Sequence, residues 1–422
     1  MFSKPALIAL LTVLVLPAVA QAEGFSDPVE ISGGKGVAPQ MVYDEAGGAT
    51  IAWENYPSME GRRVLPGGDL TPIVELADDD NYPVLVGDRF GNAALLDRND
   101  HIGDRGTGSI AATWIKASGA AGPATGVLPQ SGGDRPQGAF DGQGRLTVTF
   151  EDYDSRNLGP GLVGAVQVGA DLKAEEVTIL DDRRLFAGGP VVGSADDGST
   201  AFAWQGKRRK TRVRVVSPDG EPFSARRLPP AAYLPLQVAY GDDDGPAVLT
   251  SSVFGERSVG RYSVVGLSRT GKPGKLIGLG RKAKLAGADI AADPRGGYFA
   301  TWSSSDTGTS DNSSVKILHI SAGGRAKAPV RLTEPAGYAI TPQVAVSSTG
   351  RPTVVWGVGD RRHGDTSAIR AMTLDRRGRA GKTVTLSEER GVYGPLVGIG
   401  PGNEPIVAWG GGSGGVLVAR GR

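Results

Sequence analysis

The sequence has no cysteine, and only three of its 422 residues are histidine: His101, His319 and His363. The absence of cysteine excludes disulfide bonds, thiolate zinc sites, cysteine nucleophiles and a lipidated N-terminal cysteine. A multi-histidine metal site would need nearly all three histidines, and we predict no metal and no other cofactor. The 46 basic and 45 acidic residues leave a net charge of +1. That balance gives no general electrostatic reason to expect nucleic acid or an anionic membrane as partner.

Long apolar runs are also missing, except at the N-terminus. Lys4 precedes the apolar stretch Ala6–Ala20, and small residues at Ala18, Ala20 and Ala22 offer A-x-A cleavage sites. The stretch is shorter than the roughly 20 residues of a spanning helix. We therefore predict a signal peptide over residues 1–22, with an uncleaved anchor as the alternative. The mature chain would start near Glu23, be secreted or extracytoplasmic, and have no membrane contact after cleavage.

Glycine (65 residues) and proline (28 residues) are abundant, and their positions reveal an internal repeat. The clearest unit is Pro342–Trp356, in which a glycine follows the opening proline by eight residues and a tryptophan by fourteen. Repeats of this kind determine the fold. The eight repeat openings are Pro39, Pro83, Pro136, Pro190, Pro235, Ala288, Pro342 and Pro395. The aromatic position is filled by Trp53, Phe150, Trp204, Trp302, Trp356 and Trp409, and the copies at Pro83 and Pro235 are degenerate.

Each repeat contains four segments that are typical of strands. The segments alternate and are rich in Val, Ile and Thr, whereas Gly, Asp and Ser mark the turns between them. A four-stranded unit repeated every 44–54 residues indicates a propeller blade. We predict an all-β fold in which residues 23–422 form a single β-propeller of eight four-stranded blades, or seven if a degenerate copy is not a blade.

The two ends of the chain predict how the ring closes. After Trp409 only one further strand fits, over Val416–Ala419, so the last blade lacks its outer strand. Near the N-terminus, Pro28–Ser32 resembles a fourth strand that has no blade of its own. We expect it to complete the last blade, which would remove an exposed sheet edge.

One turn carries a family resemblance. Ser194–Thr200 reads S-A-D-D-G-S-T, and the S-x-D-x-G-x-T pattern is similar to the Asp-box of secreted bacterial, sialidase-like propellers. In that family the box is a structural hairpin far from the catalytic centre. The resemblance also implies an arginine cluster, a tyrosine–glutamate nucleophile pair and an acid/base aspartate for an active sialidase. The usual R-I-P tripeptide is absent, and the sequence assigns none of these roles, so the resemblance implies the fold and not the activity.

Function is expected on the face that carries the connections between second and third strands, because these loops are the longer and more charged ones. Aromatic residues just before the first strands would ring the channel mouth there and stack on sugar rings, or else pack between blades. Two similar loops place a histidine among Asp and Arg, which suits acid–base or ligand-binding roles or, alternatively, a solvated surface. The candidate binding residues are Tyr82, Phe186, Tyr233, Tyr338, Tyr393, Asp100, His101, Asp360, His363 and Asp365.

No catalytic residue can be assigned from these patterns. The prediction is a secreted, non-catalytic binding scaffold that holds a glycan or an envelope protein around the channel mouth. A sialidase-like glycoside hydrolase or lyase is one alternative, and a structural or assembly partner in the cell envelope is the other. Fold-level analogy cannot choose among them.

Overall fold

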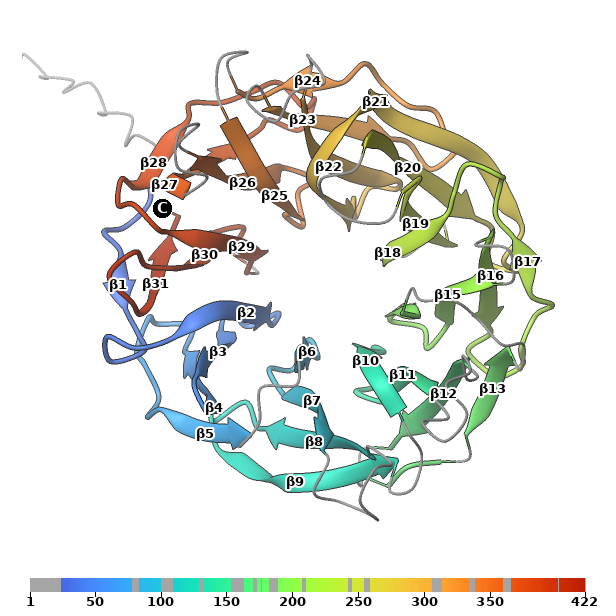
Figure 1. The fold of residues 1–422 in the computed structure, drawn as a ribbon, viewed down its shortest axis with the longest axis horizontal. Helices are drawn as coiled ribbons and strands as arrows, with labels where there is room; N and C mark the ends of the chain where they lie inside the picture. Colours follow the sequence, from blue (N-terminus) through green and yellow to red (C-terminus); the bar gives the residue numbers. More distant parts are fainter. Residues whose placement is uncertain are drawn as a thin grey trace, which may run out of the picture.

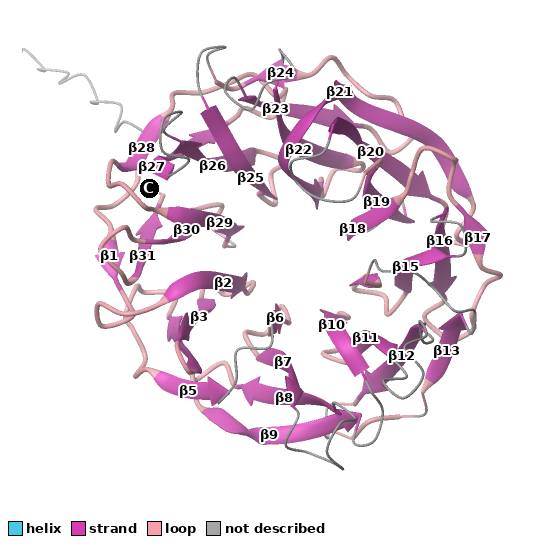
Figure 2. Ribbon diagram, in the orientation of Figure 1, coloured by secondary structure: helices cyan, strands magenta, loops and turns pink. Residues whose placement is uncertain are grey.

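The computed structural model describes residues 24–77, 83–99, 109–128, 133–152, 163–169, 173–175, 177–181, 189–206, 210–241, 245–253, 259–305, 313–333, 338–359, 366–400 and 402–421. Every regular element in these ranges is a β-strand, and the sheets stand in a ring around a central axis (Figure 1 and Figure 2). These observations confirm the prediction of an all-β fold with the general arrangement of a β-propeller.

The chain builds its sheets in sequence order, each running from an inner strand at the axis to an outer strand at the rim (Figure 1). The first two sheets are β2 (Val37–Tyr43), β3 (Ala49–Asn55), β4 (Ser58–Val64) and β5 (Val74–Ala77), then β6 (Val84–Gly87), β7 (Ala93–Asn99), β8 (Ser109–Ile115) and β9 (Ala121–Leu128). The next two are β10 (Gly133–Phe140), β11 (Leu146–Asp152), β12 (Val163–Val168) and β13 (Thr178–Asp181), then β14 (Val191–Ser194), β15 (Thr200–Gly206), β16 (Lys210–Val216) and β17 (Arg226–Arg227).

A seven-stranded sheet follows, and two four-stranded sheets complete the ring. The large sheet holds β18 (Leu234–Gly241), β19 (Gly245–Ser251), β20 (Val259–Leu267), β21 (Pro273–Ala292), β22 (Tyr298–Ser305), β23 (Ser313–Ile320) and β24 (Val330–Arg331). The last two sheets are β25 (Tyr338–Val346), β26 (Pro352–Gly359), β27 (Thr366–Thr373) and β28 (Val384–Ser387), then β29 (Tyr393–Ile399), β30 (Pro405–Gly410), β31 (Val416–Arg420) and β1 (Val29–Glu30).

The large sheet arises because β21 serves two neighbouring sheets. Its first part pairs with β20 as far as Lys284, opposite Val259, and its second part pairs with β22 from Leu285, opposite Ser304. The strand therefore runs from the rim of one sheet to the axis of the next without a break (Figure 1).

The second strands explain why the sheets must stand side by side. All seven residues of β15 and all seven of β19 are buried, without the in–out alternation of a sheet that has one wet face. Both faces of these strands are covered because each sheet packs against a neighbour on either side. The tryptophans of the repeat occupy these interfaces, and all five are at most 1% exposed: Trp53, Trp204, Trp302, Trp356 and Trp409.

The first and last sheets share a hydrophobic core in the same way as the others. Ile51 and Trp53 of the first sheet cluster with Ile406 and Val418 of the last. The short N-terminal strand β1 pairs antiparallel with β31, so the N- and C-terminal segments lie side by side at the rim (Figure 1). Burial of this interface depends on both ends of the chain.

Arginine side chains connect neighbouring sheets on the face that carries the turns between first and second strands. Arg63 forms an ion pair with Asp44, donates to Thr50 Oγ1 at 3.1 Å, and donates to the carbonyl of Gly91 in the next sheet at 2.9 Å. Gly91 has φ +92°, and a Cβ there would lie 2.5 Å from the guanidinium, so the turn needs glycine for both reasons. Arg295 spans another interface in a similar manner, from Asp293 in the turn between β21 and β22 to the carbonyl of Gly350 in the turn between β25 and β26.

We predict that Arg63→Ala lowers the free energy of unfolding by about 3–5 kcal/mol, because it leaves the carboxylate of Asp44 buried without its partner. Urea unfolding measures the change. The matched control is Arg379→Ala, which removes a similar arginine from Asp375 at an exposed turn, and little change is expected there. Equal losses in the two variants would contradict a special role for the buried pair.

Candidate functional site

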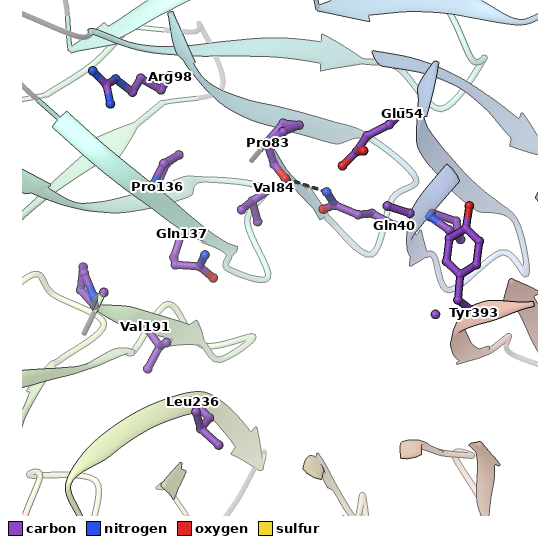
Figure 3. Close-up of a pocket in the computed structure, with 15 residues that line it drawn as sticks. Gln40, Glu54, Pro83, Val84, Arg98, Pro136, Gln137, Val191, Leu236 and Tyr393 are labelled. Atoms are coloured by element: carbon purple, nitrogen blue, oxygen red, sulfur yellow. Dashed lines mark hydrogen bonds between the residues drawn. The ribbon is translucent and has the colours of Figure 1, made fainter. Parts of the chain in front are cut away.

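A large cavity opens where the inner strands begin and the second strands end. Its volume is about 1080 Å³, and Figure 3 shows its polar and apolar lining together. This end of the ring carries the connections between second and third strands. The described lining residues are Ala38, Pro39, Gln40, Glu54, Pro83, Val84, Arg98, Pro136, Gln137, Gly189, Pro190, Val191, Leu236, Tyr393 and Gly394.

The repeat itself builds this lining. The opening prolines Pro39, Pro83, Pro136 and Pro190 all face the cavity, each from the start of a different sheet. In the sheet that begins with β18, Gln237 pairs with Leu249. This pair is equivalent to the pair of Gln40 and Ala52 in the first sheet. Leu236, one residue after Pro235, therefore takes the proline position there.

A β-bulge recurs at the mouth end of most inner strands. The register slips between Val37 and Gln40, Asp134 and Gln137, Pro235 and Gln237, Leu285 and Ala288, Ile340 and Gln343, and Tyr393 and Leu396. Two of these bulges hold a non-glycine residue at positive φ, Ala38 at 47° and Thr341 at 44°. Bulges redirect side chains beside binding sites, and such strained backbone persists where the surroundings enforce it.

Side chains just after the bulge form hydrogen bonds with the backbone of the next inner strand. Gln40 donates to the carbonyl of Pro83 at 2.6 Å and accepts from the N–H of Leu85 at 2.7 Å (Figure 3). Two residues at the equivalent repeat position form similar hydrogen bonds. Gln237 accepts from the N–H of Ile290, and Asp289 accepts from the N–H of Val344. These bonds satisfy N–H groups on the free edge of each inner strand, which no sheet partner can reach.

Asp289 is the charged member of this set, and it is buried. Burial raises the pKa of its carboxyl to about 6, although hydrogen bonds from the backbone of Val344 and Ile290 and from Gln237 act in the opposite direction. The folded protein therefore holds this proton more tightly than the unfolded chain does. The stability that Asp289 contributes is fully present below a pH of about 4 and is lost as the pH rises to about 6.

We predict that Asp289→Asn flattens the pH dependence of stability across this window. Relative to the variant, the natural protein should lose up to about 3 kcal/mol of unfolding free energy between pH 4 and pH 7. Urea unfolding at a series of pH values measures the difference, and titration of other carboxyl groups cancels between the two proteins. Parallel stability curves for the two proteins would contradict the assignment.

Among the predicted aromatic residues that the structure describes, Tyr393 lines the cavity. It pairs with Gly410 across β29 and β30, and its ring lies over that glycine: a Cβ on Gly410 would be 2.7 Å from Cζ of the ring. Burial raises the pKa of the Tyr393 hydroxyl, the nearby Glu54 carboxylate raises it further, and a hydrogen bond with the backbone of Ala38 lowers it. The hydroxyl therefore stays protonated and available as a donor at neutral pH.

The structure places two other predicted aromatic residues outside the described cavity lining. Tyr338 is half-buried and packs its ring over Gly359 of the neighbouring strand, an arrangement like that of Tyr393 over Gly410. Tyr233 is 41% exposed, and its carbonyl accepts a hydrogen bond from Gln205 of the preceding sheet. The remaining predicted residues, Tyr82, Asp100, His101, Phe186, Asp360, His363 and Asp365, lie outside the described residues.

The predicted site residues did not include Gln40, Gln137, Glu54 or Arg98, although Glu54 and Arg98 stand at the charged connections of the face on which function is expected. A signal for the glutamines was present, because the Pro-Gln dipeptide opens the repeats at Pro39, Pro136 and Pro342. Glu54 and Arg98 follow the aromatic position by one residue in adjacent repeats. Only the structure shows that this position reaches the mouth.

The described residues offer no assembled metal site: within them, no three His, Asp or Glu side chains gather as ligands. Nor do the described ranges include a helix with the length and hydrophobicity of a membrane span. The one histidine that the structure describes, His319, lies at the other end of the ring, with Nε2 at 3.1 Å from Asp293 Oδ2 and its ring against Phe299.

No protein-family model and no curated protein matches the sequence. Solved structures do resemble the fold. A lectin from Burkholderia pseudomallei superposes with a TM-score of 0.52 at 11% identity, covering 83% of this chain and 98% of the lectin. A virginiamycin B lyase from Staphylococcus aureus, crystallised with quinupristin, gives 0.48 at 12% identity, covering 79% and 96%. The β-propeller domain of the Trilobed protease from Pyrococcus furiosus gives 0.47 at 9% identity, covering 80% and 94%. At these identities the likeness concerns the fold alone, which is a β-propeller.

Proposed function

We propose that this protein is a secreted, non-catalytic binding scaffold that holds a glycan at the mouth of its central channel. The observation that carries the proposal is the cavity of about 1080 Å³, where amide, carboxylate and hydroxyl groups stand beside proline and aliphatic surfaces. This volume is slightly above the range of small-ligand sites, roughly 300–1,000 Å³.

The lining suits the two kinds of surface that a sugar presents. Gln137 and Glu54 offer planar hydrogen-bonding groups toward hydroxyls, and the Glu54 carboxylate forms no hydrogen bond with the part of the chain that the structure describes. The Tyr393 ring offers an aromatic face for the C–H side of a sugar ring, and its hydroxyl adds a directional donor. A ligand held in this way needs no acid–base residue.

The scaffold that we propose is a closed ring of eight four-stranded blades. Dividing the large sheet at β21 gives eight units, and a separate hydrophobic cluster lies between each unit and the next. β1 then supplies the outer strand of the last blade by pairing with β31. In a closed ring each blade packs against two neighbours, which explains why the second strands are buried on both faces.

We also propose that residues 1–22 are a signal peptide and that the mature protein is extracytoplasmic. Cleavage after Ala20 or Ala22 leaves Phe25 in place, and Phe25 bridges to Gly421 beside the paired termini. N-terminal sequencing of protein recovered from the culture medium or periplasm should give a start near Glu23. Recovery of a chain that begins at Met1 would overturn this proposal.

A glycan array tests the binding site. We predict that Tyr393→Ala reduces retention of the bound glycan at least about tenfold, since it removes the aromatic face and the hydroxyl together. Tyr338→Ala is the matched control, because it removes an equally half-buried ring that packs over a glycine away from the described lining. Thermal unfolding of both variants separates lost binding from lost folding, and unchanged retention in Tyr393→Ala would contradict the site.

One observation favours a glycoside hydrolase as the second candidate. The Tyr393 hydroxyl lies within the electrostatic influence of Glu54, and a tyrosine–glutamate pair is what the sialidase-like resemblance implies for a nucleophile. Tyr393→Phe separates the two functions: a binding protein keeps most of its affinity, whereas a hydrolase loses turnover. Absence of turnover by the natural protein on a broad panel of glycosides and uronides would remove this candidate.

A further inference from the structure

Charge is unevenly distributed around the ring, although the chain as a whole is nearly neutral. Residues 207–284 contain 16 Lys and Arg against 6 Asp and Glu, a net charge of +10. Residues 23–100, a stretch of equal length, contain 5 Lys and Arg against 15 Asp and Glu, a net charge of −10. The first stretch spans β16 to most of β21, and the second spans the first sheet and much of the next, so the two lie on different sides of the ring (Figure 1).

Five exposed cations of the positive stretch lie at the same end of the ring as the cavity mouth; we name them the basic sector. Lys210 begins β16 directly after the connection from β15, and Arg227 pairs with Arg212 two residues further on. The members are Lys210, Arg226, Arg227, Arg281 and Lys282, and none forms an ion pair with a residue that the structure describes.

An enlarged β-bulge carries the last two members of the basic sector, Arg281 and Lys282. Gly260 pairs with Ala283 and Tyr262 pairs with Leu279, so three residues of β21 stand opposite one residue of β20. Arg281 and Lys282 are two of those three residues, and both are exposed. Lys284 lies opposite Val259, the first residue of β20, which fixes this bulge at the mouth end of the sheet.

The basic sector lies on the same sheets that line one side of the mouth. Val191 on β14 and Leu236 on β18 face the cavity, and the outer strands of these two sheets carry Arg226, Arg227, Arg281 and Lys282. A polymer with one end in the mouth would therefore leave it over a row of uncompensated cations. Guanidinium groups pair with carboxylates through two parallel hydrogen bonds, which makes arginine well suited to such a chain.

We propose that the basic sector is a docking surface for an acidic polysaccharide, a glycan with a carboxylate on its repeating unit. This inference rests on the proposed function, because it names the chemical class of the glycan and the direction in which it leaves the mouth. The acidic residues 23–100 oppose such a chain on the other side of the ring. The charge distribution thus sets a single path for the polymer.

Binding of the natural protein to polygalacturonate, with neutral dextran as reference, tests the surface at low and at physiological salt. The basic-sector variant combines Arg226→Gln, Arg227→Gln, Arg281→Gln and Lys282→Gln. It should bind polygalacturonate about tenfold or more weakly and show a shallower salt dependence, because fewer counterions are released on binding. The matched control combines Lys272→Gln, Lys275→Gln, Arg376→Gln and Arg377→Gln, which removes four exposed charges at the opposite end. It should bind like the natural protein.

Several results would overturn the inference. Equal losses in the two variants would mean that net charge alone attracts the polymer, and no loss in the basic-sector variant would mean that the polymer binds elsewhere. Inorganic polyphosphate bound as tightly as polygalacturonate would replace the acidic glycan by a general polyanion. Tyr393→Ala distinguishes this failure from failure of the proposed function: if it alone loses glycan retention, the mouth binds a glycan and the basic sector does not.

Discussion

The structure depends on the burial of its second strands on both faces. A sheet whose central strand has no wet face cannot stand alone or at an open end, so each sheet requires a neighbour on either side. The tryptophans fill the interfaces between neighbours, and Trp53 performs this role where the first sheet meets the last. The pairing of β1 with β31 and the arginine contacts near Asp44 and Asp293 are consequences of this single requirement.

The same arrangement creates the cavity at the channel mouth. Inner strands that converge on an axis each leave one edge without a sheet partner, and the N–H groups on that edge must find other acceptors. Gln40, Gln237 and Asp289 supply those acceptors from the preceding inner strand. Bulges recur at the mouth ends of most inner strands. Gln40 both lines the cavity and links two adjacent sheets, which holds that part of the lining in place.

Much of the fold was predictable because the repeat consists of residue types whose structural preferences are local. Glycines mark the tight turns, β-branched residues mark the strands, and an aromatic residue fourteen positions after a proline marks the interface. The site was predictable only in part. Tyr393 and Tyr338 both precede or begin an inner strand and both pack over a glycine, yet only Tyr393 is among the described residues that line the cavity. Local pattern cannot separate them, because the difference lies in what the neighbouring sheet places beside each ring.

The sequence by itself determined the all-β character of the chain, the order of its strands and turns, and the N-terminal strand that pairs with β31, since these follow from local propensity and spacing. Tertiary structure decided which of the equivalent positions line the cavity. Gln40 became a link between sheets, Asp289 became a buried acid, and Glu54 remained available at the mouth, although all three stand at recurring repeat positions. The physical reason is that hydrogen-bond partners, burial and charge environment come from the adjacent sheets, whose residues lie some fifty positions away along the chain.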